Sequence, residues 1–465
     1  MDKDLEERLA AKDSYITIHD FYVLMAFYQS ISQKVLRKFD KDGSILKVQK
    51  KYEESRETVQ DAQFVIAPQD TYYHHYQMYK ANKFEYVELV KSLYNIEEKN
   101  PKLKNIFQDV RGSTSSLPSE TAFEKIDSRN EVSFEENLEI IKRSSGAKDN
   151  YDYTSKNIRK LITKLVGSKK EGVSIYDPAL GTASLLLGIN QAALKENRYY
   201  GQDISTQAVK TAIMSAIVND IAEDKFEFKN ENTLANNWEF GKVDIVVSDP
   251  PINMKWNVDR NLSQDRRYRD YGEMPNKADW GFILDGIDKL SDNGMMVVSV
   301  VQGTLFRGAK EYNIRRKLLE DGKIRAVIQL PGNTKISTTI ATCLLVLRKS
   351  SEDKDVFFIN ASQEYEKKGL ENILTEANVD KIVDTFNEKK EVQRFSHMAS
   401  YEEIEKNDFN LSVARYVNQY KFKEKLDYQE EIKNLEKLDE KLSQTDVALK
   451  NLMGDLGLVE INDQK

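Results

Sequence analysis

The spacing of hydrophobic and polar positions changes twice along the chain and divides it into three regions. Up to about residue 145, apolar side chains recur at intervals of three and four, most clearly over residues 21–28 and 84–93. This is the period of an amphipathic helix. We therefore predict a helical N-terminal domain over residues 1–145, and we assign its aromatic side chains to a core rather than to a ligand cage.

Between residues 146 and 400, short apolar runs alternate with helical segments. Runs rich in Val, Ile and Tyr predict strands at residues 173–176, 198–201, 226–228, 243–247, 295–301, 324–329 and 342–347. The segments between them predict helices at residues 158–166, 183–194, 206–221, 278–290 and 311–319. This alternation is typical of a doubly wound α/β sheet. Sheets of this class bind ligands at the carboxyl ends of their strands.

Residues 401–465 are polar and carry one apolar stripe. Leu435, Leu442, Leu449 and Leu456 recur every seven residues, and Leu438 and Leu452 lie three positions after the first and third of them. A heptad stripe on so polar a helix requires a partner helix. We predict a C-terminal helical tail that docks a partner; the alternative is a helix packed on its own domain.

The composition fits a soluble chain of more than one domain. It has 465 residues, of which 40% are hydrophobic and 31% charged, and no apolar run approaches the ~18–20 residues that span a bilayer. The charged N-terminus has no apolar signal core. A single cysteine excludes an internal disulfide and a cysteine-cluster metal site, and the adjacent His74 and His75 would not face one side of a helix. We expect a cytoplasmic protein without a membrane anchor or a metal.

The charge balance is acidic, with a formal net charge of −7 and an isoelectric point of about 5.5. Contacts of Lys and Arg with phosphates supply most of the affinity of proteins for duplex nucleic acid. This chain would therefore bind DNA only through local basic patches or through a partner that carries the positive surface.

The strand predicted at residues 243–247 runs into Ser248-Asp249-Pro250-Pro251-Ile252. Proline has no N–H to donate and a fixed φ, so the pair ends the strand and stiffens the loop that leaves it. Asp249 is thereby held where ligands of α/β sheets bind. Taken alone, the motif is equally typical of an ordinary strand-ending turn.

Two upstream motifs favour a binding site over a simple turn. Asp177-Pro178-Ala179-Leu180-Gly181-Thr182 follows a strand and opens a helix, and Gly181 permits a tight turn and close approach of a ligand. About 25 residues after Asp177, one strand later, Asp203 stands where a nucleotide-binding α/β fold places an acid on ribose hydroxyls. The glycine turn, the acid and Asp-Pro-Pro occur in that order on successive predicted strands.

These motifs resemble those of a known family. Residues 177–187, 201–203, 232–234 and 249–251 are similar to the cofactor and catalytic motifs of amino-group DNA methyltransferases. Further matches lie at residues 153–154, 271–272, 278–280, 303–308, 314–315, 330–331, 340–343, 407–411 and 415–416. Together they resemble the modification subunit of type I restriction-modification systems, from about residue 60 to the end.

The resemblance implies S-adenosylmethionine as the cofactor and the N6 amine of adenine in DNA as the target. The implied cofactor-binding residues are Tyr153, Thr154, Asp177, Pro178, Gly181, Thr182, Asp203, Asn232 and Thr233. The catalytic loop is Asp249, Pro250, Pro251 and Ile252, in which the Asp249 carboxylate and the Pro250 carbonyl accept hydrogen bonds from N6 and direct it at the methyl group. An adenine inside a duplex must first be flipped out.

The sequence departs from the family pattern at four places. Ile252 replaces the aromatic residue that stacks on the flipped base, a contact worth roughly 1–3 kcal/mol. Ala183 replaces a glycine, Asn232 an aspartate, and Lys335-Ile336 an aromatic pair. One alternative is therefore a weak or inactive scaffold that keeps the fold. Another is a methyltransferase for RNA or protein, which Asp249 disfavours because protein-methylating relatives tend to have Asn there.

The resemblance also implies partners. We expect a specificity subunit that reads the DNA sequence, a restriction subunit, and double-stranded DNA with a flipped adenine. Lys255, Arg266 and Arg267 follow the catalytic loop and are candidate phosphate contacts. The alternative is a solvated surface loop, because acidic residues are interspersed among them.

Overall fold

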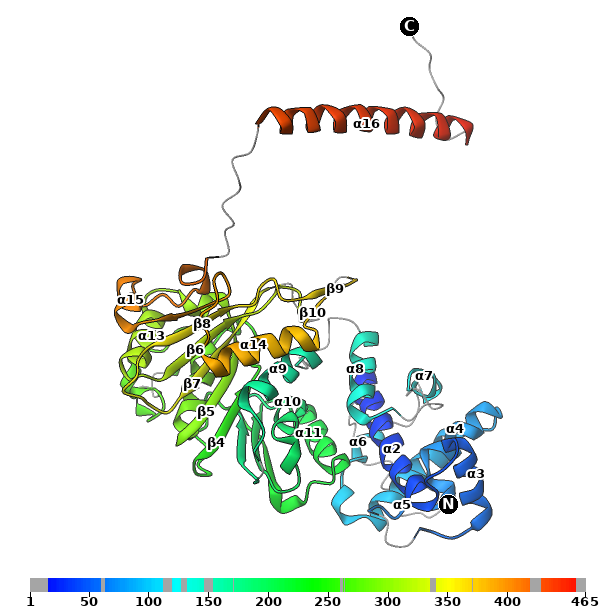
Figure 1. Ribbon diagram of the computed structural model, residues 1–465. Helices are drawn as coiled ribbons and strands as arrows, with labels where there is room; N and C mark the ends of the chain where they lie inside the picture. The colour runs from blue at the N-terminus through cyan, green and yellow to red at the C-terminus, as the bar shows by residue number, and fades with distance from the viewer. Residues whose placement is uncertain are drawn as a thin grey trace. The chain divides into compact units, whose positions relative to one another are not determined.

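The structure is a computed structural model and is shown in Figure 1. It describes residues 16–59, 63–111, 119–126, 132–145, 154–169, 171–259, 262, 264–334, 340–369, 371–418 and 428–456. The chain forms two compact units, Met1–Val417 and Asn418–Lys465.

The N-terminal part of the first unit is helical, as its apolar spacing predicts. Its longest helix, α2 (Ile18–Phe39), is buried over every residue from His19 to Ser32, so it lies at the centre of the core. Thr17 caps the helix by accepting a hydrogen bond from the Asp20 amide at 3.1 Å. The surrounding helices are α3 (Ile45–Ser55), α4 (Tyr72–Lys80), α5 (Tyr86–Lys99), α6 (Gln108–Arg111), α7 (Ser119–Lys125) and α8 (Phe134–Ser145).

The remainder of this unit is built on a nine-stranded sheet among the described residues. Its strands are β1 (Ser174–Asp177), β2 (Arg198–Asp203), β3 (Phe226–Asn230), β4 (Val243–Ser248), β5 (Leu290–Val301), β6 (Ile324–Gln329), β7 (Thr342–Arg348), β8 (Val356–Asn360) and β11 (Ser396–Ala399). They lie in the order β11-β8-β6-β7-β5-β4-β1-β2-β3. Strand β7 is antiparallel to β5 and β6, and β11 is antiparallel to β8; the other neighbours are parallel.

Helices cover both faces of the sheet, which confirms the predicted doubly wound α/β class. One core contains α9 (Lys156–Val166), α10 (Ser184–Gly188), α11 (Thr206–Val218) and α14 (Glu376–Glu388). The other contains α12 (Asp279–Lys289) and α13 (Lys310–Glu320). Successive strand residues face opposite sides. In β4, Ile245 and Val247 therefore join the first core and Val246 the second.

The structure differs from the predicted elements within one helix and in the part of the chain after residue 347, where α14 and α15 (Tyr401–Lys406) were also not predicted. The expected helix over residues 183–194 is divided into α10 and a short turn at Gln191–Ala193, because Asn190 adopts a left-handed conformation with φ +49°. The sheet also continues past residue 347 into β8 and β11. A small hairpin, β9 (Glu366–Lys368) with β10 (Glu371–Ile373), follows β8.

The compact unit extends beyond the expected domain boundary at residue 400. Helix α15 (Tyr401–Lys406) and the segment after it return to the sheet, and Leu411, Val413 and Val417 are buried in its second core. At the other boundary, Met214 and Ile217 of α11 join the core of the N-terminal helices. These shared side chains make the two predicted domains parts of one unit.

The second unit contains one long helix, α16 (Tyr428–Asp455), in which the heptad leucines are exposed. Leu435, Leu438, Leu442 and Leu449 each expose more than half of their surface, from 55% to 62%. None of the described helices combines the length and the apolar character needed to cross a membrane.

Candidate active site

The sheet topology brings the ends of β1 and β4 together at one crevice. From β1 the chain passes to β2 and β3 on one side, and it then crosses to β4 and β5 on the other. Adjacent parallel strands whose connections leave in opposite directions create the opening where α/β sheets bind ligands. Asp177 ends β1, and Asp249 follows the last residue of its neighbour β4.

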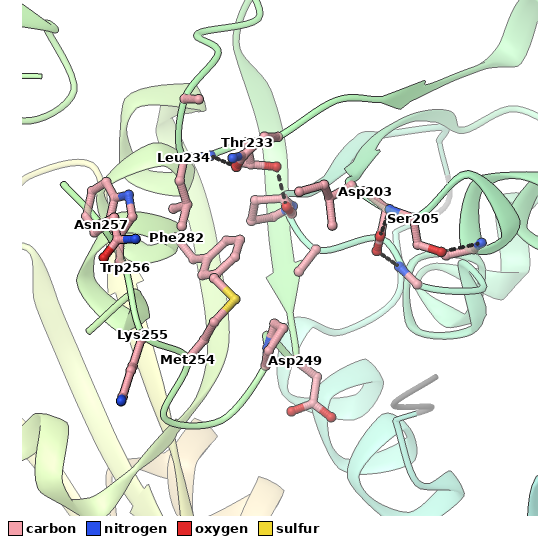
Figure 2. A pocket seen from close by; sticks show the side chains of 18 of the residues that line it. Asp203, Ser205, Thr233, Leu234, Asp249, Met254, Lys255, Trp256, Asn257 and Phe282 are labelled. Atoms are coloured by element: carbon pink, nitrogen blue, oxygen red, sulfur yellow. Dashed lines mark hydrogen bonds between the residues drawn. The ribbon is translucent and has the colours of Figure 1, made fainter. Parts of the chain in front are cut away.

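A cavity of about 1150 Å³ opens at this point (Figure 2). The predicted residues that line it are Pro178, Gly181, Thr182, Asp203, Asn232, Thr233, Asp249, Pro251 and Lys255. Ligand pockets typically enclose ~300–1,000 Å³, so the cavity has room for a nucleoside-sized ligand and a second group. Asp177, Pro250 and Ile252 do not line it.

The turn after β1 is held by the residue that ends β2. Gly181 has φ +53°, and its amide donates to Asp203 Oδ2 at 2.9 Å. The other oxygen, Asp203 Oδ1, accepts from the Ser205 amide at 2.8 Å. Each carboxylate oxygen keeps a further acceptor position. Burial raises the pKa of Asp203, while these two amides oppose that shift. Asp203 thus fixes the glycine turn and still presents acceptors to the cavity.

Asp177 lies beneath the cavity lining and joins β1 to β4. Its Oδ1 accepts from the Ala179 amide and from the Ser248 hydroxyl, both at 2.9 Å. Burial raises the pKa of Asp177 to about 7, and the neighbouring acids Asp203 and Asp249 shift it in the same direction. The cavity is therefore surrounded by acidic groups that favour a cationic ligand.

The segment after β3 is tied to the turn after β1. The Thr233 hydroxyl donates to the Pro178 carbonyl at 2.6 Å, and Asn232 Oδ1 accepts from the Leu234 amide at 3.0 Å. Thr233 is buried, so its side chain acts as a link between the two loops.

The chain that leaves the predicted catalytic loop is paired with a later segment. After Ile252 the chain turns at Asn253, which has φ +55°. Trp256 then donates its amide to the Asn276 carbonyl at 2.9 Å, and the Ala278 amide donates to the Met254 carbonyl at 3.1 Å. This short antiparallel pairing fixes the position of the chain that leaves Asp249.

Sequence reasoning missed the apolar walls of the cavity. They include Leu234, Met254, Trp256 and Phe282 (Figure 2). Ile204 also lines the cavity. Ile204 is 73% exposed, and its position directly after the predicted ribose acid was an available signal.

Gly281 makes one of these walls possible. A Cβ there would lie 2.7 Å from Leu234 and 2.9 Å from Trp256, which is too close for an unshifted side chain. The start of α2 also contributes Thr17, His19 and Asp20 to the lining. No local pattern links these three residues to the rest of the cavity, so sequence reasoning could not find them.

The remaining residues that the sequence predicted for the site do not lie together. Lys255 is exposed at the cavity. Arg266 pairs with Glu239 at 3.0 Å and with Asp288 at 3.1 Å. Thr154 precedes α9 and does not line the cavity, and Tyr153 and Lys335-Ile336 lie outside the described residues.

The prediction that Arg267 contacts DNA is wrong. Its side chain is 0% exposed and pairs with Asp265 at 2.7 Å and with Asp285 at 2.8 Å. A guanidinium enclosed in this way cannot reach a phosphate. Among the described residues, no cluster of three or more His, Cys, Asp or Glu side chains is arranged to hold a metal ion.

The fold and crevice define the class of doubly wound α/β proteins, whose ligands bind outside the carboxyl ends of the strands. The sequence profile of the N-6 DNA methylase family matches residues 134–425, which is more than half of the chain. The protein therefore belongs to the N-6 DNA methylase family.

Several relatives share this region. The type I restriction enzyme MpnII methylase subunit of Mycoplasma pneumoniae is 32% identical over 338 residues, covering 69% of this chain and 62% of the relative. The MjaVII methylase subunit of Methanocaldococcus jannaschii is 30% identical over 311 residues, covering 62% and 53%. The match thus spans less than two thirds of either relative.

A solved structure supports the same fold. The type I restriction-modification methyltransferase subunit from Streptococcus thermophilus superposes with a TM-score of 0.74 at 27% identity, covering 90% of this chain and 98% of that one.

Replacing Asp177 by Asn should remove a pH dependence of stability. The folded pKa is about 7, whereas an unfolded Asp titrates near ~3.9, so the folded protein holds a proton that the unfolded chain releases between these values. The resulting stabilisation is complete below pH ~4 and is lost as the pH rises through about 7. Relative to Asp177→Asn, the free energy of unfolding of the natural protein should fall by up to about 1.4 kcal/mol per pH unit.

Denaturant unfolding from about pH 5 to pH 8 measures this difference. Asn keeps an oxygen that can accept from Ala179 and Ser248, so the comparison isolates the charge. Parallel pH profiles for the two proteins would contradict the expected effect.

Proposed function

We propose that the protein is the S-adenosylmethionine-dependent modification subunit of a type I restriction-modification complex and methylates N6 of a flipped adenine in DNA. The observation that carries this proposal is the position of Asp249-Pro250-Pro251. The acid lies on the wall of the cavity that Gly181 and Asp203 also line. Membership of the N-6 DNA methylase family and the names of the relatives support it.

The residues of the cavity fit the proposed cofactor. Asp203 has free acceptor positions for ribose hydroxyls, and the turn at Gly181 allows close approach of the backbone. Ile204, Leu234 and Phe282 offer apolar surface for an adenine ring, with Asn232 and Thr233 at its edge. The acids around the cavity favour the positive charge of the sulfonium, which supplies an electrophilic methyl group when the cofactor is bound.

Asp249 and the Pro250 carbonyl are the groups proposed to act on the target amine. The N6 lone pair is delocalised into the adenine ring, so the amine is a weak nucleophile. Hydrogen bonds from N6–H to the two acceptors return electron density to nitrogen and orient it. When bound, the sulfonium would supply the methyl group and keep the electron pair of the broken S–C bond on sulfur, while Asp249 and the Pro250 carbonyl would hold N6 until the methylated nitrogen releases its extra proton to solvent. The rate gain comes from positioning and preorganised charge. The two prolines keep both acceptors in place.

The partners are proposed from the resemblance to type I modification subunits, and surface features suggest where they bind. The exposed leucines of α16 are the proposed docking stripe for the specificity subunit, which would read the DNA sequence. Lys255 and Arg266 are the proposed phosphate contacts, and Arg266 would exchange Glu239 and Asp288 for phosphate. With a net charge of −7, the chain relies on its partner for most of the positive surface. We place the complex, including a restriction subunit, in the cytoplasm.

Replacement of Asp249 by Ala tests the proposed chemistry. In the complex assembled with the specificity subunit, transfer of labelled methyl from S-adenosylmethionine to DNA should fall roughly 100-fold or more, as for loss of one preorganised charge-stabilising group. The affinity for the cofactor measured without DNA should stay nearly constant.

Unchanged transfer by Asp249→Ala would refute the assignment. No transfer by the natural complex, with cofactor binding intact, would instead identify an inactive scaffold.

The role of α16 is tested on its apolar stripe. Replacing Leu435, Leu442 and Leu449 by Ser should abolish the complex with the specificity subunit, because these side chains lie on one face of the heptad. Size-exclusion chromatography with light scattering measures the assembly, and cofactor binding should persist. The matched control replaces Lys437, Glu440 and Asn451 on other faces of the helix by Ala. Assembly of the leucine variant at natural affinity would exclude α16 as the docking element.

A further inference from the structure

We propose that Arg267 is a positioning residue that sets the adenosine end of the cofactor cavity from inside the protein core. This inference rests on the proposed cofactor. In place of the DNA contact that the sequence suggested for Arg267, its side chain is assigned the role of holding three chain segments together.

The guanidinium of Arg267 bonds all three segments at once. Nη1 donates to the Thr233 carbonyl at 2.6 Å and to Asp285 Oδ1 at 2.8 Å. Nε and Nη2 form the two arms of a fork on Asp265, at 3.0 Å to Oδ1 and 2.7 Å to Oδ2. The segment after β3, the segment after the catalytic loop and helix α12 are thereby fixed around one planar group. Lysine cannot reproduce that arrangement.

The network continues from Asp285 to the ends of the neighbouring strands β1 and β2. The Tyr176 hydroxyl lies 2.8 Å from Asp285 Oδ2 and 2.8 Å from Gln202 Oε1. One hydroxyl proton can serve only one of these acceptors. Gln202 Nε2 is buried and has no hydrogen-bond partner among the described residues, so rotation of the amide gives an N–H that donates to the tyrosine oxygen.

The residues reached by the network are next to the predicted cofactor residues. Tyr176 directly precedes Asp177, and Gln202 directly precedes Asp203. Thr233, held through its carbonyl by Arg267, lines the cavity and binds the Pro178 carbonyl with its hydroxyl. Asp265 also lines the cavity. A displacement of Arg267 would therefore be transmitted to three sides of the nucleoside pocket.

Stability alone is a weak reason for a buried charge cluster of this kind. The desolvation of buried ions consumes most of their mutual attraction, and apolar replacements of similar volume are often neutral or stabilising. In this protein the cluster joins three segments through directional hydrogen bonds. Here those segments carry the walls of the cavity, which favours a positioning role.

Arg267→Lys tests the proposal on the full-length chain without DNA. Binding of S-adenosylmethionine and of 5′-methylthioadenosine is measured by calorimetry well below the unfolding temperature. We expect both affinities to fall by the same factor, about tenfold or more, as for loss of a hydrogen bond to a charged group. An equal loss for the ligand without the amino-acid part locates the effect at the adenosine end.

Arg315→Lys is the matched control. Arg315 is also buried, and it bonds the carbonyls of Thr304, Arg307 and Phe409 instead of the cofactor loops. We expect it to lower the unfolding temperature while both affinities stay within about twofold. This separates positioning from a general loss of stability.

The outcomes distinguish this inference from the proposed function. If the natural protein binds both ligands and Arg267→Lys binds them equally well, the positioning role is refuted and the proposed function stands. If the natural protein binds neither ligand, the proposed function fails and this inference fails with it. Should Arg267→Lys not fold, Asp285→Asn provides the second test, because the neutral amide keeps the shape of the site and leaves the fork on Asp265 intact. Natural affinities in that variant would likewise refute the role.

Discussion

The interaction on which the site depends is the cross-linking of strand ends by buried side-chain hydrogen bonds. Ser248 at the end of β4 bonds Asp177 at the end of β1, and Asp203 at the end of β2 bonds the Gly181 amide. Thr233 after β3 bonds the Pro178 carbonyl. Loops at strand ends have few backbone partners of their own, so without these links each would move independently. With them, four separate segments form one rigid rim around the cavity.

The same links bring three acidic side chains close together at one crevice. Asp177, Asp203 and Asp249 surround one crevice, and the burial that makes their hydrogen bonds strong also raises the pKa of Asp177 and of Asp203. A cationic ligand relieves the repulsion among them, whereas an anionic ligand increases it. On the other side of the loop after β3, Arg267 balances Asp265 and Asp285 inside the core, so its charge is not available to a ligand.

The sequence predicted those features that depend on local patterns. Apolar runs located the central strands, and Asp249-Pro250-Pro251 located the strand end, because the conformational limits of proline are intrinsic to the residue. The role of Arg267 was not predictable, since Arg266 and Arg267 share one local context and differ only in the face that folding turns inward. Its partner Asp285 lies in a different predicted element. Similarly, β11 forms an edge of the sheet only through pairing with β8, which the short segment 396–399 does not indicate.

Two departures from the family pattern, Ala183 and Asn232, are held in place by hydrogen bonds of the rim. Ala183 has φ +62°, a left-handed conformation that costs a non-glycine residue about 1–2 kcal/mol, yet its Cβ is fully buried and the turn persists. The turn persists because the Leu180 amide bonds the Gln202 carbonyl and the Ala183 amide bonds the Leu180 carbonyl, both at 2.9 Å. Asn232 uses its side-chain oxygen to accept from the Leu234 amide, as a carboxylate oxygen would. In both places hydrogen bonds of the rim hold the replacing residue, which is compatible with a working site.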